Sequence, residues 1–333
     1  MSQLQPSPTW DVQDSTKIQC YMRCPRRYFF EYVLGWRSAE PNIDLIFGTA
    51  WHIAQAILLT EGYTADAAAK AFAAFYDYFR ESFGESLDET LAPKNPSNAM
   101  RGLAQYIARY KNDLLSFTPL YVETAGCVPV SRDRVVYFKC DAIIRNSEGQ
   151  HLALEHKTTT RFSTSWAAQW RMKMQLGVYS HVMHCLYPPE SVYGVIVNGF
   201  FVHNAPRMKL NGEPYAGEKD NEFHRVPVRR SILSMNAWLV EVNHYLDQLE
   251  LDFSLLADAD EGDNILFAFK RNTEHCADFG QCPFLDHCSV WHNPLRYADA
   301  PPVGFAVNHW DPRNMPGVRE TIQVQPLTEM DAS

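Results

Sequence analysis

Apolar positions recur with two different periods along this chain, and the change of period divides it into a helical first third and a mixed second part. In the first third apolar residues recur every three or four positions, which is the period of an amphipathic helix. From residue 121 they gather in short runs rich in β-branched and aromatic residues, which are typical of strands. The predicted helices span 47–59, 65–83 and 98–115, and the predicted strands span 121–130, 134–145 and 151–157.

The neighbouring segments complete the predicted fold. A polar turn at 146–149 joins the last two strands in a hairpin. A helix is expected at 16–32, with Ser15 as its cap, and another at 166–186, which two prolines end. Further strands are expected at 191–203 and 223–228, and a further helix at 231–251. This order predicts an α/β fold in which a mixed sheet is flanked by helices.

The length of the chain and the composition of its two ends predict one folded domain with a flexible N-terminal arm and an extended C-terminal tail. A chain of 333 residues suffices for one large domain with helical additions. We expect a flexible arm at 1–14, a single domain at 15–298 and an extended tail at 299–333. Within the domain, the helical part spans 15–118, the catalytic core 119–205, and the C-terminal helix with the cysteine segment 223–298.

Composition and charge narrow the classes of function. Neither a signal peptide nor a run of about 18 apolar residues is visible, so we expect a cytoplasmic protein that does not enter a membrane. The eight cysteines are therefore interpreted as thiols or metal ligands rather than as disulfides. A net charge of -9 excludes a globally basic surface and restricts any contact with nucleic acid to a local patch.

Two acidic residues on the predicted hairpin are candidates for a metal site. Asp141 and Glu155 lie on adjoining strands, and Lys157 follows Glu155 by two positions, so it points to the same face. Carboxylates suit Mg²⁺ or Mn²⁺, and the backbone carbonyl of His156 is a further candidate ligand. Such a site can hydrolyse phosphodiesters, with Lys157 stabilising charge on the phosphate. The pattern alone is more typical of a solvated hairpin edge, because strand ends often carry charged residues.

Two further sequence motifs accompany this hairpin, one on each side of it. Gly48-Thr49-Ala50-Trp51-His52 precedes it, and Gln175-Leu176-Gly177-Val178-Tyr179 follows it. With these motifs the chain resembles the PD-(D/E)XK nuclease superfamily, in particular its RecB-like exonuclease branch, which is similar to nucleases of CRISPR adaptation and of phages. Cys140 stands where the family name has proline.

The resemblance implies a restriction-endonuclease-like core and a role for each motif residue. It implies that His52, Asp141 and Glu155 are metal ligands and that Lys157 is the catalytic lysine. Gln175 and Tyr179 would orient Lys157 or grip DNA. Without the resemblance, His52 is interpreted as a hydrogen-bonded core histidine. An imidazole ligand would favour Mn²⁺ without excluding Mg²⁺.

The resemblance also assigns a role to four cysteines. It implies a 4Fe-4S cluster held by one cysteine before the core, Cys24, and three after it, Cys276, Cys282 and Cys288. Zinc is the competing interpretation, with Cys24, His275 or His287 completing a tetrahedral site beside the other three cysteines. Unligated thiols are the third.

Cationic and aromatic residues suggest contacts to a strand end or to a single strand of DNA. The predicted contacts are Arg26, Arg27, Tyr28, Arg161, Trp166 and Arg171. Together these features predict an exonuclease acting at DNA ends in recombination, repair or phage DNA processing. Because no phosphate-binding Gly-Lys-Thr loop is present, a helicase or recombination protein that assists it would be a separate chain. A nucleic-acid-binding scaffold with little turnover and a zinc-bound protein-interaction module are the alternatives.

Overall fold

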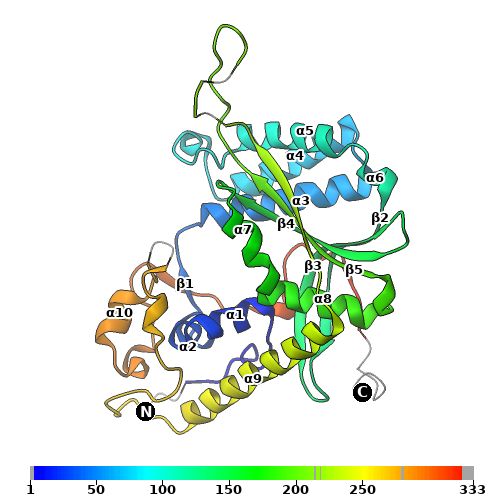
Figure 1. The fold of residues 1–333 in the computed structure, drawn as a ribbon. Helices are drawn as coiled ribbons and strands as arrows, with labels where there is room; N and C mark the ends of the chain where they lie inside the picture. Colours follow the sequence, from blue (N-terminus) through cyan, green and yellow to red (C-terminus); the bar gives the residue numbers. More distant parts are fainter. Residues whose placement is uncertain (1–3, 214, 218, 279–280, 325–333) are drawn as a thin grey trace.

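The expected α/β fold is present, with a mixed six-stranded sheet at its centre (Figure 1). The computed structural model describes residues 4–213, 215–217, 219–278 and 281–324. The strand order is β6-β5-β4-β3-β2-β8, in which β4 and β5 are parallel and β3 is antiparallel to both of its neighbours. The central strands are β2 (Phe117–Pro129), β3 (Val135–Asn146), β4 (His151–Thr159), β5 (Val192–Phe201) and β6 (Glu222–Val228).

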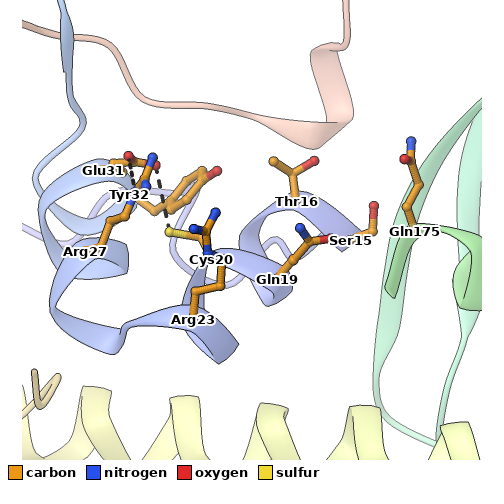
Figure 2. Close-up of a pocket in the computed structure, with 9 residues that line it drawn as sticks. All are labelled: Ser15, Thr16, Gln19, Cys20, Arg23, Arg27, Glu31, Tyr32 and Gln175. Atoms are coloured by element: carbon orange, nitrogen blue, oxygen red, sulfur yellow. Dashed lines mark hydrogen bonds and ion pairs between the residues drawn. The ribbon is translucent and has the colours of Figure 1, made fainter. Parts of the chain in front are cut away.

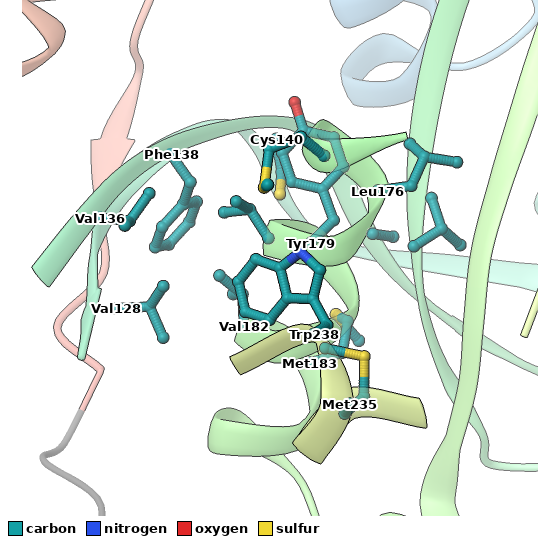
Figure 3. Packing of buried hydrophobic residues seen from close by; sticks show 14 of the residues in the cluster. Val128, Val136, Phe138, Cys140, Leu176, Tyr179, Val182, Met183, Met235 and Trp238 are labelled. Carbon is teal, nitrogen blue, oxygen red and sulfur yellow. The ribbon is translucent and has the colours of Figure 1, made fainter. Parts of the chain in front are cut away.

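Helices cover both faces of this sheet. On one face, α8 (Met174–Leu186) and α9 (Ile232–Ala257) contribute Val182 and Trp238 to one apolar cluster (Figure 3). The same cluster includes Val195 and Val197 of β5. On the other face, α3 (Ile43–Glu61), α4 (Ala65–Arg80) and α5 (Pro96–Tyr110) share a cluster with Phe200. Successive side chains of a strand point to opposite faces, so apolar residues at both sets of positions bury the sheet on both sides. The short α6 (Asp113–Ser116) leads into β2.

Residues from both ends of the chain form a second region, the terminal lobe, which we define as residues 15–38 and 259–310. It contains α1 (Ser15–Arg23), α2 (Pro25–Tyr28), the π-helical turn Phe29–Val33 and α10 (Leu285–Val290). The strands β1 (Trp36–Ser38) and β7 (Phe305–Val307) pair in a separate small sheet. A mainly aromatic cluster, which includes Phe29, Phe30 and Phe284, fills this lobe.

Two predicted long helices are interrupted, each for a local reason. The helix expected at 16–32 begins at Ser15 with Asp14 as its cap, and it breaks at Cys24, which is extended before Pro25. The residue before a proline is disfavoured in the helical conformation. The helix expected at 166–186 is divided into α7 (Thr164–Gln169), the turn Trp170–Met172 and α8, because Lys173 has a ψ of 136°.

The described part of the predicted arm packs against α1, which a loose arm would not do, and two short strands of the predicted tail pair with the rest of the protein. Thr9 and Val12 are buried, and their carbonyl oxygens accept hydrogen bonds from the Lys17 ammonium at 2.5 and 2.7 Å. Near the other end, β8 (Glu320–Thr321) adds a parallel strand to β2. Strands this short leave no periodic signal in the sequence.

Helix α3 is the one element of the described chain long and apolar enough to cross a membrane. Core helices of soluble proteins pass the same test, and α3 contributes Phe47, Trp51 and Leu58 to the cluster beside α4 and α5. Packing within the protein therefore accounts for these three residues, whereas Leu45 of the same helix is exposed.

Candidate active site

The candidate site lies where β3 and β4 separate. Their ladder runs from Arg145↔His151 to Ala142↔Leu154 and stops there. Asp141 and Glu155 are the next residues on the two strands. The His156 N–H, which has no ladder partner on β3, donates instead to Asp141 Oδ2 at 2.6 Å. The end of the ladder thus holds one carboxylate and brings a second beside it.

His52 and Glu123 complete one half of the site. His52 Nδ1 lies 2.9 Å from Asp141 Oδ1, so α3 delivers its histidine to the β3 carboxylate. Ligand atoms of His52, Glu123 and Asp141 all lie within 4.8 Å of one another. Glu123 has a φ of 52°, and a non-glycine residue in this region is often held there for a functional reason.

Glu123 was absent from the sequence-based predictions. The β2–β3 register pairs Val122 with Ala142 and Thr124 with Cys140, which sets Glu123 opposite Asp141. Its partner Lys139 lies 2.6 Å from Glu123 Oε2. A single acidic residue inside an otherwise apolar strand was the signal available in the sequence.

The predicted Glu155, Lys157, Gln175 and Tyr179 form the other half. The Lys157 ammonium pairs with Glu155 Oε1, and the same oxygen accepts from Gln175 Nε2 at 3.0 Å. Gln175 Nε2 also donates to the Tyr179 hydroxyl at 2.9 Å, which donates to the Lys139 carbonyl at 2.5 Å. Gln175 therefore orients Glu155, and Tyr179 fixes α8 to β3.

Burial and neighbouring charges shift the pKa values of the three carboxyl groups, and the direction differs among them. Burial works to raise the pKa of Asp141, but His52 and the His156 N–H outweigh it and hold that pKa well below its ordinary value. Burial and the charge of Asp141 raise the pKa of Glu155, and they raise that of Glu123 to about 6. Three buried carboxylates thus repel one another.

The donor set fits a divalent cation. Glu155 Oε2 is buried and has no hydrogen-bond partner among the described residues, although a buried carboxylate oxygen without a partner is costly. A cation shared by Asp141, Glu123 and Glu155 would remove both this cost and the repulsion. Binding through His52 Nδ1 requires loss of the proton that Asp141 stabilises there, since burial alone would lower the pKa of His52 and Asp141 raises it.

The side chain of His156 has a separate place. Burial lowers its pKa to about 3, so its imidazole is neutral, and its Nδ1 lies 3.1 Å from Asn198 Nδ2. A role for its backbone carbonyl as a ligand stays a prediction.

The structure brings the four predicted cysteines into one neighbourhood of the terminal lobe. Burial raises the pKa of the Cys282 and Cys288 thiols, and the charges of Cys24 and Cys276 add to both shifts. The Cys282 N–H donates to the Cys276 carbonyl at 2.8 Å. The Cys24 sulfur accepts a hydrogen bond of 3.4 Å from the N–H of Asn272. Amide hydrogen bonds to sulfur are common around thiolate-ligated clusters.

Two predicted DNA contacts are wrong, because the side chains are inside the protein. Arg26 is 3% exposed and donates to the carbonyls of Phe269 and Leu266 at 2.9 and 3.2 Å. Tyr28 is 0% exposed, and its hydroxyl is hydrogen-bonded to Gln13. Both residues stabilise the terminal lobe.

The other four predicted contacts reach the surface. Arg161 and Arg171 are exposed, and Arg27 is partly exposed and pairs with Glu31 at 2.7 Å. Trp166 is half-buried and packs against Gly199 and Phe201, which leaves only part of its ring for a base. Their contacts to DNA stay predictions.

Comparison with known proteins identifies a family for most of the chain. A sequence profile described as "PD-(D/E)XK nuclease superfamily" matches residues 15–289. No curated protein matches the chain. The crystal structure of SSO0001 is similar over 72% of this chain and 76% of that one, with 12% identity and a TM-score of 0.29, which is too low to carry an argument.

Proposed function

Since the chain belongs to the PD-(D/E)XK nuclease superfamily, whose members are metal-dependent nucleases, we propose that it is a DNA exonuclease of the RecB-like type. It would hydrolyse phosphodiester bonds at DNA ends with Mg²⁺ or Mn²⁺, in the cytoplasm, during recombination, repair or phage DNA processing. A helicase or recombination protein that opens a duplex for it would be a separate chain.

One observation carries the proposal: three carboxylates and a histidine converge beside a lysine. His52, Glu123 and Asp141 offer ligand atoms within 4.8 Å of one another. Glu155 adds an unpartnered oxygen on the side of Lys157. A solvated hairpin edge would leave these side chains exposed, whereas Asp141 is 6% exposed and Glu155 is 1% exposed.

The residues divide the chemistry among them. His52, Glu123, Asp141 and Glu155 would hold the cation, which supplies positive charge against the phosphate and acidifies a water molecule. Gln175 keeps Glu155 Oε1 in place, so that Oε2 stays directed at the site. Lys157 donates to a non-bridging phosphate oxygen as water attacks phosphorus and the bond to the departing oxygen breaks.

The four cysteines support a 4Fe-4S cluster as a second, structural cofactor. The resemblance to the RecB-like branch supports this assignment to Cys24, Cys276, Cys282 and Cys288, and zinc or unligated thiols are its alternatives. Arg26, Arg27 and Arg271 lower the pKa of nearby thiols and would offset the charge of such a cluster.

Digestion of end-labelled DNA tests the nuclease. We expect single-stranded or duplex DNA to be shortened from its ends with Mn²⁺ or Mg²⁺, and we expect EDTA to stop the reaction. A circular single strand of the same length is the control, because an exonuclease has no end to attack there. Absence of metal-dependent cleavage, or cleavage unchanged in Lys157→Ala, would overturn the proposal.

Anaerobic purification tests the cluster. The expected sample is brown, with the broad visible absorbance of iron–sulfur clusters, and the colour is lost in Cys282→Ala but kept in Cys127→Ala. A colourless sample with stoichiometric zinc would mean that the cysteines bind zinc instead of an iron–sulfur cluster. A metal-free sample would leave these residues as ordinary thiols.

A further inference from the structure

A pocket of about 270 Å³ lies between the terminal lobe and the first turn of α8 (Figure 2). Gln175, which orients Glu155, forms part of its wall, so the pocket adjoins the active site. Its volume is near the lower end of ligand-binding pockets, which suits one unit of a polymer rather than a duplex. It is lined by Ser15, Thr16, Gln19, Cys20, Arg23, Arg27, Glu31, Tyr32 and Gln175.

The lining of this pocket favours an anion. Arg23 and Arg27 contribute guanidinium groups, and Glu31 is the one acidic side chain in the lining. Glu31 is already shared, because it pairs with Arg27 at 2.7 Å and with Arg37 at 3.4 Å. Arg23 pairs at 3.3 Å with Asp278, which is outside the lining. Positive charge therefore exceeds negative charge along the wall.

Lys173 stands at the start of α8, two positions before Gln175, the residue of α8 that lines the pocket. It occupies the break before α8, and its carbonyl accepts a hydrogen bond of 3.1 Å from Arg230, which stabilises the break. Burial lowers the pKa of Lys173, and the positive charges of Arg23 and Lys157 lower it further. A phosphate bound in the pocket would offset the charges of Arg23 and Lys173.

We propose that this pocket is a subsite for one nucleotide of a single DNA strand next to the scissile bond, with its phosphate held by Arg23 and Lys173. The inference rests on the proposed nuclease function, and it adds that one strand leaves the site towards the terminal lobe. Contacts to phosphate are independent of sequence, so this subsite orients the strand without selecting bases.

Salt dependence of binding tests the subsite without cleavage. In EDTA, we expect the binding of a fluorescent single-stranded oligonucleotide to fall with salt less steeply in Arg23→Gln/Lys173→Gln than in the wild type. Loss of two contacts lowers the slope by about 1.4 on a single strand. Arg23→Lys should keep the wild-type slope, and Lys70→Gln, on the distant and exposed surface of α4, is the matched control.

Kinetics separate the subsite from the catalytic centre. With Mn²⁺, the double variant should lose about tenfold more kcat/KM on the oligonucleotide than on bis(p-nitrophenyl) phosphate. The smaller substrate can occupy the active site but does not extend into the pocket. An unchanged salt slope, an equal loss on both substrates, or an equal change in slope for a blunt duplex would overturn the subsite. If the wild type hydrolyses neither substrate, the nuclease proposal fails, while the salt slope still decides the binding site.

Discussion

Two groups of side chains are positioned by different kinds of structure: the catalytic cluster (His52, Glu123, Asp141 and Glu155) and the cysteine cluster (Cys24, Cys276, Cys282 and Cys288). Asp141 and Glu155 extend from neighbouring sheet strands, where hydrogen bonds from His156 and Gln175 fix each carboxylate. The cysteines lie on turns and helix ends: Cys24 separates α1 from α2, and Cys276 ends a single helical turn. The sheet and the helices packed on it hold the first cluster, whereas the second joins segments that few regular elements connect.

This difference predicts that substitutions in the two clusters have different consequences. Loss of a carboxylate should abolish chemistry and leave the fold intact, because the sheet ladder does not depend on it. If the proposed 4Fe-4S cluster is bound, loss of a cysteine should weaken the fold around the terminal lobe, because metal binding to thiolates contributes directly to folding free energy.

The largest expected effect is on activity, in Asp141→Asn. This change removes a charged metal ligand, and we expect kcat on end-labelled DNA to fall about 1000-fold or more. The melting temperature should change little, because the amide keeps an oxygen acceptor. Glu148→Gln, in the exposed β3–β4 turn, is the control and should match the wild type in both measurements. A large loss of stability in Asp141→Asn would contradict the comparison.

The second effect is on stability, in Cys282→Ser. We expect the free energy of unfolding of the anaerobic protein to fall by on the order of 5 kcal/mol if the cluster is bound. Denaturant titration of the variant beside Cys127→Ser, which alters a half-buried cysteine of β2, measures the difference. Equal stability of the two variants would remove the distinction between the clusters.

The third effect is a pH dependence at Lys17, next to the terminal lobe's first helix cap. Burial lowers its pKa to about 8 from an ordinary 10.5. Between these two pH values the unfolded chain holds more protons than the folded one, so the free energy of unfolding increases as the pH rises through this window. Below the window this gain in stability is absent. The gain is about 3 kcal/mol. Unfolding at several pH values should show the rise in the wild type and not in Lys17→Met.

The smallest effects concern the two motif glycines and should have opposite signs. A Cβ at Gly177 would lie 2.2 Å from Nε1 of the buried Trp238, so Gly177→Ala should cost about 1–3 kcal/mol of unfolding free energy. A Cβ at Gly48 would meet only Thr158 Oγ1 at 3.6 Å, so Gly48→Ala should add up to about 1 kcal/mol by favouring the helix. Thermal unfolding of both variants measures the signs.

The parts of the site that the sequence predicted are those that neighbouring residues determine. Asp141, Glu155 and Lys157 lie on one hairpin with a recognisable turn, so their relation follows from strand geometry alone. Glu123 depends on the register between β2 and β3 and on an unusual backbone conformation, neither of which leaves a periodic signal.

The wrong predictions share a physical cause. Arg26 and Tyr28 have the composition of a DNA-binding surface, but the same side chains stabilise an interior when carbonyls and aromatic rings surround them. The carbonyls that accept from Arg26 belong to residues 266 and 269, some 240 positions away in the sequence. Only the folded chain brings these groups together.

The strand β8 gives the chain an order of assembly. The N–H of Arg319 donates to the carbonyl of Glu123 at 2.9 Å, and the Lys139 ammonium donates to the carbonyl of Pro316 at 2.7 Å. A chain emerging from the ribosome thus carries His52 and Asp141 long before the segment that fastens Glu123 exists. On the proposed function, we expect a chain truncated after Gly317 to be less active in the end-labelled assay, because the carbonyl of Glu123 loses its partner Arg319. The last-made residues would then complete a site whose other ligands are made early.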